Sequence, residues 1–411
     1  MTRINGDRLL SDLRELATIG KFQTGVDRVA FSAADIEARR WLVAKLQAAG
    51  LYAAMDQLGN VLGRYPNVAT AVLIGSHTDT VPRGGWLDGA LGVIYGLEIA
   101  RSAIEADEHL TTGIDVVSFQ DEEGTFLPFL GSRSFCADVT DSEIAHCRSR
   151  DGTPLPQALA SVANEAPPLR LDSARHLCFL EAHIEQGPRL EGADRRIGVV
   201  SAIVGIRRFR IRARGRADHA GTTPMAARSD AGTELIKLAA WVGEEFSQLA
   251  GPDTVWNIGN IEFRPGAANV VPAEAELLLE FRDPHEDTLD AIESRLLERV
   301  VSAPQNRSCK IEAEQLVRIP PTSMASDLRE LIAMAATAAG EEPLVMPSGA
   351  GHDAMVLARF IPAAMMVVPS IGGRSHDVAE NTSDADITRG CEVLAAGASK
   401  LRWQYSIRPA S

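Results

Sequence analysis

Histidines and carboxylates recur in short segments of this sequence, each just after an apolar run or inside a glycine-rich loop. The segment GSHTDT carries His77 and Asp79, whose side chains point the same way on an extended chain because they are two residues apart. A metal-binding histidine usually donates its other ring N–H to a carboxylate. We therefore predict that His77 is a ligand and that the Asp79 carboxylate is its partner, although His-x-Asp alone is also typical of a surface histidine.

Two further segments bring carboxylates. Asp88 lies in GGWLDGALGV, where a helical pattern begins, so it is either a metal ligand or the N-cap of that helix. In VVSFQDEEGT, the residues Asp121, Glu122 and Glu123 follow a buried strand. Three consecutive carboxylates are costly to crowd together unless a cation neutralises them, so we favour a cation site over a solvated loop.

The remaining donors come from two later segments. FLEAHIEQGP offers His183, Glu185 and Gln186, and GGRSHDVAE supplies His376. Mixed nitrogen and oxygen ligands without sulfur suit zinc, manganese, cobalt or nickel. The donors exceed what one tetrahedral ion takes, so we predict two divalent ions. One of the two adjacent glutamates can bind metal while the other acts as a base, which is the arrangement that metal-assisted hydrolysis needs.

Other catalytic motifs are missing from the sequence. It has no GxxxxGK[ST] phosphate loop, no GxGxxG after a strand and no HExxH. Ser348 in PSGAG lacks the GxSxG frame of a nucleophile elbow. The GAGH stretch, with Gly349 and Gly351, instead indicates a tight loop whose backbone approaches a ligand.

The elements that must position these residues alternate between helix and strand in the first half of the chain. Short apolar strands between helical patterns predict an α/β domain with a mostly parallel sheet covered on both faces. The helical patterns and apolar strands fall at residues 32–50, 71–75, 89–102, 114–119, 177–180 and 197–200.

The pattern changes near residue 206. A long alternating strand is followed by the order helix, strand, strand, helix, strand, which is the ferredoxin-like arrangement. These elements are expected at residues 226–249, 255–263, 275–281, 289–301 and 310–317. The α/β pattern resumes after Pro320 and Pro321, with a strand at 363–368 and a final helix at 385–401. We therefore predict an α+β domain at 207–320, inserted into a larger domain formed by 1–206 and 321–411.

Composition limits the function classes. The chain has 411 residues, enough for two domains, and its net charge of −14 argues against nucleic acid as a partner. No apolar run reaches the roughly 18 residues of a membrane helix, and no signal segment is visible, so we expect a cytoplasmic protein without a membrane partner. Five scattered cysteines without CxxC pairing indicate reduced thiols. One basic run alternates with apolar residues and predicts a strand with a solvated charged face: Arg208, Arg210, Arg212, Arg214 and Arg216.

The sequence resembles the hydantoinase/carbamoylase branch of the M20-type metallohydrolases. This branch includes N-carbamoyl-L-amino-acid hydrolases, allantoate and ureidoglycolate amidohydrolases, and β-ureidopropionases. The resemblance covers nearly the whole chain, and HIEQGP is its most specific part, because His183 stands where the peptidase relatives usually carry an acidic ligand. It rests on GVDRVAFSAADIEARRWL, GSHTDTVPRGGWLDGALGV, DEEGTFLPFLGSRSF, HIEQGPRLE, AGTTPMAARSDA, SGAGHDAM and SHDVAE.

The resemblance implies a metal centre in the larger domain and a lid in the smaller one, which would also form a homodimer interface. One metal ion would be held by His77, Asp88 and His183. The second ion would share Asp88 and take Glu123 and His376.

The resemblance also implies roles for other residues. The catalytic set would be Glu122, Asp79 and His219, with Glu122 as the general base and His219 steadying the oxyanion. Arg282 and Asn269 would bind the substrate carboxylate, which a guanidinium pairs with in bidentate fashion. Without the motif, a salt bridge for Arg282 and an ordinary loop position for His219 are the alternatives. The residues predicted to bind substrate are Gln186, Asn269, Arg282, Gly349 and Gly351.

The expected reaction is hydrolysis of the carbamoyl C–N bond of an N-carbamoyl-L-amino acid, with allantoate or ureidoglycolate as alternative substrates. EEGTFL departs from the EEGSRF of many relatives, with Phe126 at the changed step, so the subfamily stays open. A peptidase or deacylase and a binding protein without catalysis are the rival interpretations. His183 and Gln186 weigh against the first rival, and the retained Glu122 weighs against the second.

Overall fold

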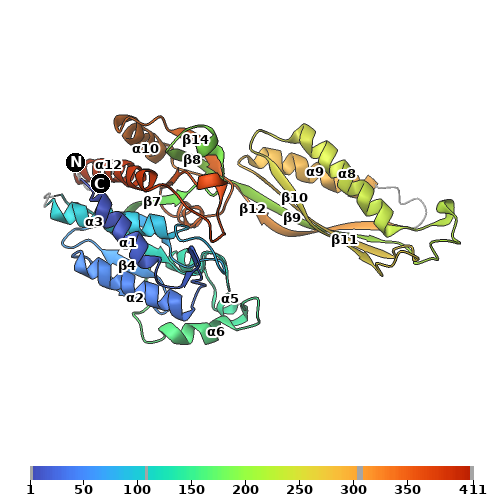
Figure 1. The fold of residues 1–411 in the computed structure, drawn as a ribbon, viewed down its shortest axis with the longest axis horizontal. Coiled ribbons are helices and arrows are strands. Elements are labelled where there is room, and N and C mark those ends of the chain that lie inside the picture. Colours follow the sequence, from blue (N-terminus) through green and yellow to red (C-terminus); the bar gives the residue numbers. More distant parts are fainter. Residues whose placement is uncertain (1–2, 107–109, 303–308, 408–411) are drawn as a thin grey trace. The chain divides into compact units, whose positions relative to one another are not determined.

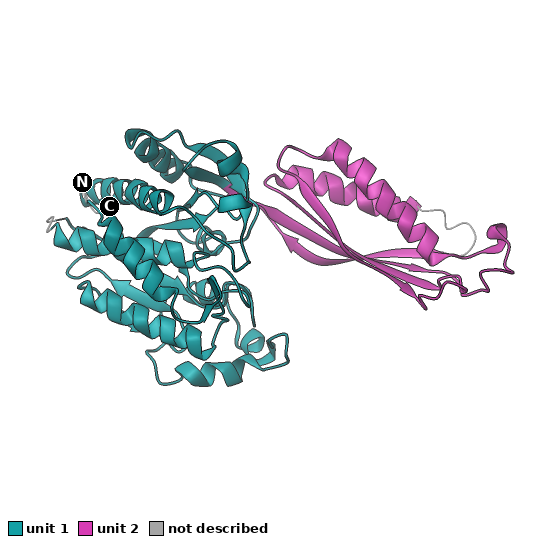
Figure 2. Cartoon of the chain, viewed as in Figure 1, with its two compact units in different colours: residues 1–201, 323–411 teal, residues 202–322 magenta. Residues whose placement is uncertain are grey.

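The computed structural model describes residues 3–106, 110–302 and 309–407. It divides into two compact units, residues 1–201 with 323–411 and residues 202–322 (Figure 2). Across the described ranges, none of the helices has both the length and the apolar character needed to cross a membrane. Each unit has a sheet and a hydrophobic core of its own.

Unit 1 is built on a nine-stranded sheet in the order β13-β8-β15-β7-β5-β6-β4-β3, with β14 paired to β8 (Figure 1). The four central strands run parallel to one another and confirm the predicted α/β class: β15 (Ala363–Val368), β7 (His176–Ile184), β5 (Thr70–His77) and β6 (Thr112–Phe119). Antiparallel pairing adds β8 (Gly198–Ile203) next to β15, and β4 (Val61–Arg64) and then β3 (Tyr52–Met55) next to β6. Strands β13 (Thr322–Ser323) and β14 (Leu344–Ser348) pair with β8.

The central strands are buried on both faces, as their uninterrupted apolar runs predict. Alternate residues such as Val72 and Ile74 join the main core with the helix α3. Their neighbours face the other way, where Phe119 and Phe179 contact each other and Phe119 contacts Phe135 of α4. The helices of unit 1 are α1 (Gly6–Leu16), α2 (Ala33–Ala48), α3 (Ala90–Glu105), α4 (Leu130–Phe135), α5 (Asp141–His146), α6 (Leu155–Ala158), α7 (Arg189–Gly192), α10 (Ser326–Ala338), α11 (Asp353–Leu357) and α12 (Asp384–Ile407).

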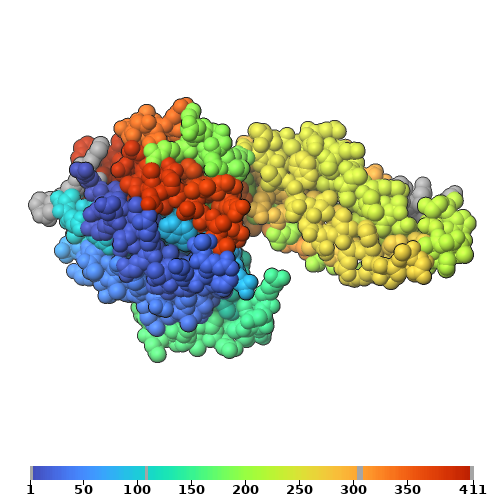
Figure 3. Space-filling model, viewed as in Figure 1, coloured from blue at the N-terminus to red at the C-terminus, as the bar shows by residue number. Residues whose placement is uncertain are grey.

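The first and last helices of the chain pack against each other in unit 1. The N-terminal segment (blue) and the C-terminal segment (red) lie side by side on its surface (Figure 3), and α1 packs against α12. A short hairpin, β1 (Lys21–Phe22) and β2 (Gly25–Val26), follows α1, and Thr24 at its turn donates a hydrogen bond to the main chain of Val378. The early residues therefore contact a loop that follows β15.

Unit 2 has the ferredoxin-like arrangement that the sequence predicts. Its elements are β9 (Gly205–Arg214), α8 (Ala231–Leu249), β10 (Val255–Arg264), β11 (Glu274–Asp283), α9 (Glu286–Ser302) and β12 (Lys310–Ile319), and its antiparallel sheet has the order β10-β11-β9-β12. Helix α8 begins later than the predicted position 226, because Asp230 caps it by accepting a hydrogen bond from the Thr233 amide. Residues 225–227 form a separate 3₁₀ turn.

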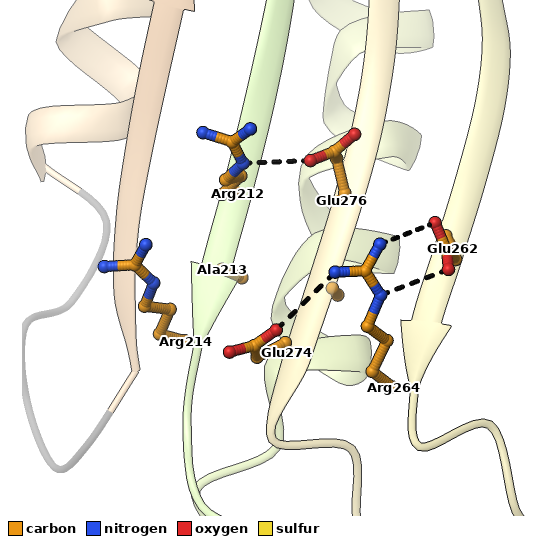
Figure 4. Close-up of a pocket in the computed structure, with 8 residues that line it drawn as sticks. Arg212, Ala213, Arg214, Glu262, Arg264, Glu274 and Glu276 are labelled. Carbon is orange, nitrogen blue, oxygen red and sulfur yellow. Dashed lines mark hydrogen bonds and ion pairs between the residues drawn. The ribbon is translucent and has the colours of Figure 1, made fainter.

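One face of the unit 2 sheet packs on α8 and α9, and the other carries the arginines of the basic run. Each arginine of this run on β9 pairs with a glutamate of a neighbouring strand, as Arg212 does with Glu276 and Glu314. Figure 4 shows the same pattern at one end of this face, where Arg264 bonds Glu262 and lies beside Glu274. The basic run therefore forms the predicted solvated face, with its charges paired inside the sheet.

Candidate metal centre

The predicted metal ligands lie at one edge of the unit 1 sheet. His77 and His183 are near the carboxyl ends of β5 and β7, and Glu123 follows β6. His376 comes after β15, and Asp88 precedes α3. Because these strands are parallel and adjacent, their carboxyl ends meet at the same edge, where ligands bind in open α/β sheets.

Asp88 is the centre of the cluster. Its Oδ1 lies 3.0 Å from His183 Nε2 and 3.8 Å from His77 Nε2, so these three side chains form one group that could hold a metal ion. Its Oδ2 lies 3.2 Å from His376 Nε2, which is 3.6 Å from Glu123 Oε1, and these form a second group. The Asp88 carboxylate is therefore shared, with one oxygen facing each group. No side chain caps α3, the helix for which Asp88 was the alternative N-cap.

Glu122 lies beside the first group, with its Oε2 3.6 Å from His77 Nε2. Burial and the nearby negative charges, among them Asp353 and Glu123, raise the pKa of Glu122 well above its usual value. Burial, together with Asp88, raises the pKa of Glu123 to about 8. The site thus crowds carboxylates in a way that strongly favours a bound cation.

The two buried histidines are oriented through their main-chain contacts. Nδ1 of His77 lies 2.9 Å from the main-chain oxygen of Asp79, and Nδ1 of His183 lies 2.9 Å from that of Ile184. Each Nδ1 therefore donates to a carbonyl, and each Nε2 points at Asp88. The prediction that the Asp79 carboxylate is the partner of His77 is wrong, because Asp79 accepts through its main-chain oxygen. Its carboxylate Oδ1 is 3.8 Å from His77 Nδ1 and faces Arg39.

The donor set fits divalent ions on two observations. Glu123 Oε1 is buried and has no hydrogen-bond partner among the described residues. At Gly89 the backbone has φ +65°, and a Cβ there would lie 2.4 Å from His77 Nε2. Glycine thus leaves the imidazole nitrogen uncovered.

The chain is similar to known proteins over most of its length. Residues 73–400 match the profile of peptidase family M20/M25/M40. The chain belongs to this family. It is 33% identical over 404 residues to an N-carbamoyl-L-amino-acid amidohydrolase of Paenarthrobacter aurescens, covering 96% of this chain and 97% of that one. It is 31% identical to an allantoate amidohydrolase of Escherichia coli, covering 92% and 94%.

A solved structure adds the branch of the family. An amidase of the hydantoinase/carbamoylase family from Burkholderia phymatum is 45% identical, with a TM-score of 0.91, and the match covers 98% of this chain and 99% of that one. The resemblance seen in the sequence is confirmed.

Among the residues predicted to bind substrate in this M20-family chain, Gln186 lies in the metal cluster. Its Nε2 is 3.1 Å from Asp88 Oδ2, and its Oε1 is buried without a partner among the described residues. A Cβ at Gly351 would meet the ring of Phe129 at 2.9 Å, whereas Gly349 has open space around it. Both glycines belong to the loop between β14 and α11.

Two more residues predicted to bind substrate, Asn269 and Arg282, belong to unit 2 together with the predicted catalytic His219, and that unit does not bring the three together. His219 pairs with Val270 in an isolated bridge, and the Ala220 amide donates to the Asn269 oxygen, so these two loops are adjacent. They follow the end of β9 and precede β11, whereas Arg282 lies near the far end of β11. At about 3.3 Å per residue, the strand separates the two positions by roughly 25 Å. Arg282 also makes the salt bridge to Glu280 that the sequence offered as its alternative, at 2.7 Å.

Two buried polar residues beside the candidate metal site, Glu380 and His352, were not predicted from the sequence. Glu380 accepts hydrogen bonds from the Leu87 and Asp88 amides, both 3.0 Å long, and so fixes the loop that carries the shared carboxylate. His352 packs its ring 4.5 Å from that of His183 and contacts Ser348. Both residues stand inside segments that carry the family resemblance, but neither spacing nor periodicity indicates a role for them.

Gly89 provides a direct test of the M20 metal site. Gly89→Ala should weaken metal binding and activity, because the added methyl group would displace the His77 ring. It should also cost about 1–3 kcal/mol of unfolding free energy, because φ +65° with ψ −47° is a strained conformation for a residue with a Cβ. Calorimetric metal titration and denaturant unfolding measure the two effects.

Gly340→Ala is the matched control for this substitution. Gly340 also has a positive φ, +84°, but a Cβ there would meet nothing within 4 Å. The control should lose stability through its positive φ alone and keep its metal affinity. Equal metal affinity in the two variants would show that Gly89 is not required to keep the imidazole clear.

Proposed function

We propose that this chain is a two-metal amidohydrolase that cleaves the carbamoyl C–N bond of N-carbamoyl-L-amino acids. The observation that carries the proposal is the shared Asp88 carboxylate. One of its oxygens faces His77 and His183, and the other faces His376 beside Glu123. The N-carbamoyl-L-amino-acid amidohydrolase of Paenarthrobacter aurescens and the Burkholderia phymatum amidase both match nearly the full length of the chain. We propose zinc as the metal, with manganese, cobalt or nickel as alternatives.

The residues of the site divide the work of hydrolysis. Divalent ions held by the two groups supply the Lewis acidity that lets water ionise near neutral pH. Glu122 lies beside the first group and outside both sets of ligands, so we assign it the role of general base. It takes the proton from the attacking water and returns it to the leaving nitrogen. Gln186 presents a buried amide oxygen that suits the N–H groups of a ureido substrate.

The substrate carboxylate needs a positively charged partner from outside the candidate metal site, because Asp88, Glu122 and Glu123 make that site rich in carboxylates. We propose that Arg282 provides it, with unit 2 acting as a lid. His219 and Asn269 lie too far along unit 2 to join Arg282 at one point. We therefore propose a homodimer through unit 2, in which His219 and Asn269 of one chain serve the site of the other. We also propose a cytoplasmic location, because the five cysteines are free thiols and disulfides are rare in the cytoplasm.

Allantoate is the second candidate substrate, because an allantoate amidohydrolase matches 92% of this chain. Allantoate and N-carbamoyl amino acids share a ureido group and a carboxylate, so the same residues would bind either. A ureidoglycolate hydrolase from rice is also similar, at 29% identity. A panel of ureido acids, tested on the purified metal-loaded protein with ammonia release as the readout, decides among these substrates.

The carboxylate requirement gives the sharpest test of the substrate class. Accurate placement of a poorly electrophilic ureido carbon is worth several kcal/mol, so a substrate without the carboxylate should be cleaved far more slowly. Arg282→Ala should lower kcat/KM for an N-carbamoyl amino acid. The expected loss of transition-state stabilisation is about 2–5 kcal/mol, as when a buried charge loses its partner. Its metal content should not change.

Arg208→Ala is the matched control, because Arg208 pairs with the same carboxylate, Glu280, from the neighbouring strand. It should leave kcat/KM nearly unchanged. Equal rates on an N-carbamoyl amino acid and its carboxamide would refute the carboxylate clamp and favour a peptidase-like or deacylase substrate. A protein that binds metal and cleaves nothing on the panel would favour the binding homologue.

A further inference from the structure

Arg39 is a fully buried arginine of α2 whose donors converge on the ends of two central strands. Its Nη2 lies 3.0 Å from the main-chain oxygen of Phe119, the last residue of β6, and 3.3 Å from Asp79 Oδ1. Its Nη1 donates to the Gly59 carbonyl at 3.1 Å. Its Nε donates to Asp35 Oδ1 at 2.8 Å, one helical turn away. One guanidinium thus ties α2 to the loops after β5 and β6.

Asp79 connects Arg39 to both His77 and Glu123 of the candidate metal site. Its main-chain oxygen accepts from His77 Nδ1 at 2.9 Å, which fixes the ring whose Nε2 faces Asp88. Its Oδ2 accepts from the Glu123 amide at 3.3 Å. The residue that orients the His77 ring therefore also holds the backbone of Glu122 and Glu123, and its carboxylate is itself held by Arg39.

We propose that Arg39 is a positioning residue for the metal centre, which acts through Asp79 to set the distance between His77 and the Glu122–Glu123 pair. The planar guanidinium is needed for this task, because it bonds Asp79 and the Phe119 carbonyl with one nitrogen while two other nitrogens bond Asp35 and Gly59. A lysine ammonium keeps the charge but cannot reproduce this planar spread of donors. The inference rests on the proposed metal centre.

Arg402 offers a matched control for a merely structural role. It is also fully buried, and its Nε donates to the main-chain oxygen of Thr112 at 3.0 Å. Thr112 begins β6, whereas Phe119 ends it, so the two arginines hold the same strand at opposite ends. Arg402→Lys should perturb folding as Arg39→Lys does, but it is remote from the metal ligands.

The test compares metal affinity in the stripped full-length protein. Arg39→Lys should lower the affinity for Zn²⁺, measured by competition with a chelator, by about tenfold, the usual scale for residues behind a ligand. It should also alter the visible absorption of the Co²⁺-loaded protein, which reports ligand geometry. Arg402→Lys should leave both unchanged at comparable loss of melting temperature. Equal changes in the two variants would overturn the proposal.

A double-variant cycle tests whether Arg39 acts through Asp79. Asp79→Asn should weaken Zn²⁺ binding, and Arg39→Lys added to it should cause no further loss, because the shared contact is already broken. Additive losses would contradict this route. If the Arg39→Lys variant does not fold, Asp35→Asn is the substitute variant for the Zn²⁺ affinity measurement. The amide introduced at this position would offer one acceptor oxygen where the carboxylate now accepts from Arg39, Gln120 and the Phe31 amide, so affinity should fall in the same direction.

The wild-type protein separates the two proposals. If it binds no Zn²⁺ at all, the proposed metal centre fails before Arg39 is tested. If it binds Zn²⁺ with unchanged affinity in Arg39→Lys, the metal centre stands and only the positioning role is wrong.

Discussion

Replacing Glu122 with glutamine should lower kcat by about 10²–10⁴-fold while the protein keeps its metal ions. Glutamine retains the shape of the side chain but cannot take up a proton, and Glu122 belongs to neither candidate ligand group. Its carboxylate nevertheless lies 3.6 Å from His77 Nε2, which is close enough to reach the reacting water. Steady-state kinetics and elemental analysis of the same preparation measure the two quantities.

Glu123→Gln is the control, because the two glutamates are neighbours in the chain and each substitution removes the same carboxylate. Glu123 Oε1 is the buried oxygen without a partner among the described residues, 3.6 Å from His376 Nε2. Its substitution should reduce metal content, and added metal should restore part of the activity. Exchanged phenotypes, with Glu122→Gln losing metal and Glu123→Gln losing only turnover, would show that base and ligand are assigned the wrong way round.

Removal of metal should abolish hydrolysis entirely, since no other group among the described residues of the site can supply Lewis acidity. Zinc, manganese, cobalt or nickel should restore the activity. Stability should respond as well: a ligand at 100 times its Kd adds about 2.7 kcal/mol to the unfolding free energy. Ammonia release and the melting temperature, each followed across a titration of metal into the stripped protein, measure both effects.

Magnesium is the control ion for this experiment, because it prefers oxygen ligands and keeps its waters. Three imidazoles suit it poorly, so it should restore little activity. Full turnover in protein that elemental analysis shows to be free of metal would refute the two-metal proposal.

The fold was largely predictable because its elements have clear periods. Strand β9 alternates inward Phe209 and Ile211 with outward arginines, which is the period of a strand with one buried face. The strand β8 was harder to predict. It belongs to the apolar series of the parallel sheet, yet it pairs antiparallel with β15. Only the four-residue helix α7 lies between β7 and β8, which does not make the helical crossover typical of parallel strands.

The site was predictable as far as residue type and strand position decide it. His77, Asp88, His183, Glu123 and His376 lie in two candidate ligand groups, and their division into these two sets was implied by the family resemblance. Sequence alone could not show which atom of Asp79 faces His77, because main-chain and side-chain oxygens are equally close in the chain. It also could not show Arg39, since one arginine in a helix rich in charged residues has no distinctive spacing.

The entry and exit of unit 2 are neighbours in space. The amide of Met324 donates to the Ser201 oxygen at 3.1 Å, and Ile206 pairs with Ile319 where β9 and β12 begin and end. An inserted domain whose two ends lie close together can be exchanged without changing the path of the chain in the other domain. Unit 2 has its own core, so the segment from β9 to β12 can be exchanged for that of a relative without cutting a strand of the unit 1 sheet. Exchange of unit 2 at this one junction would leave both candidate ligand groups in unit 1 unchanged.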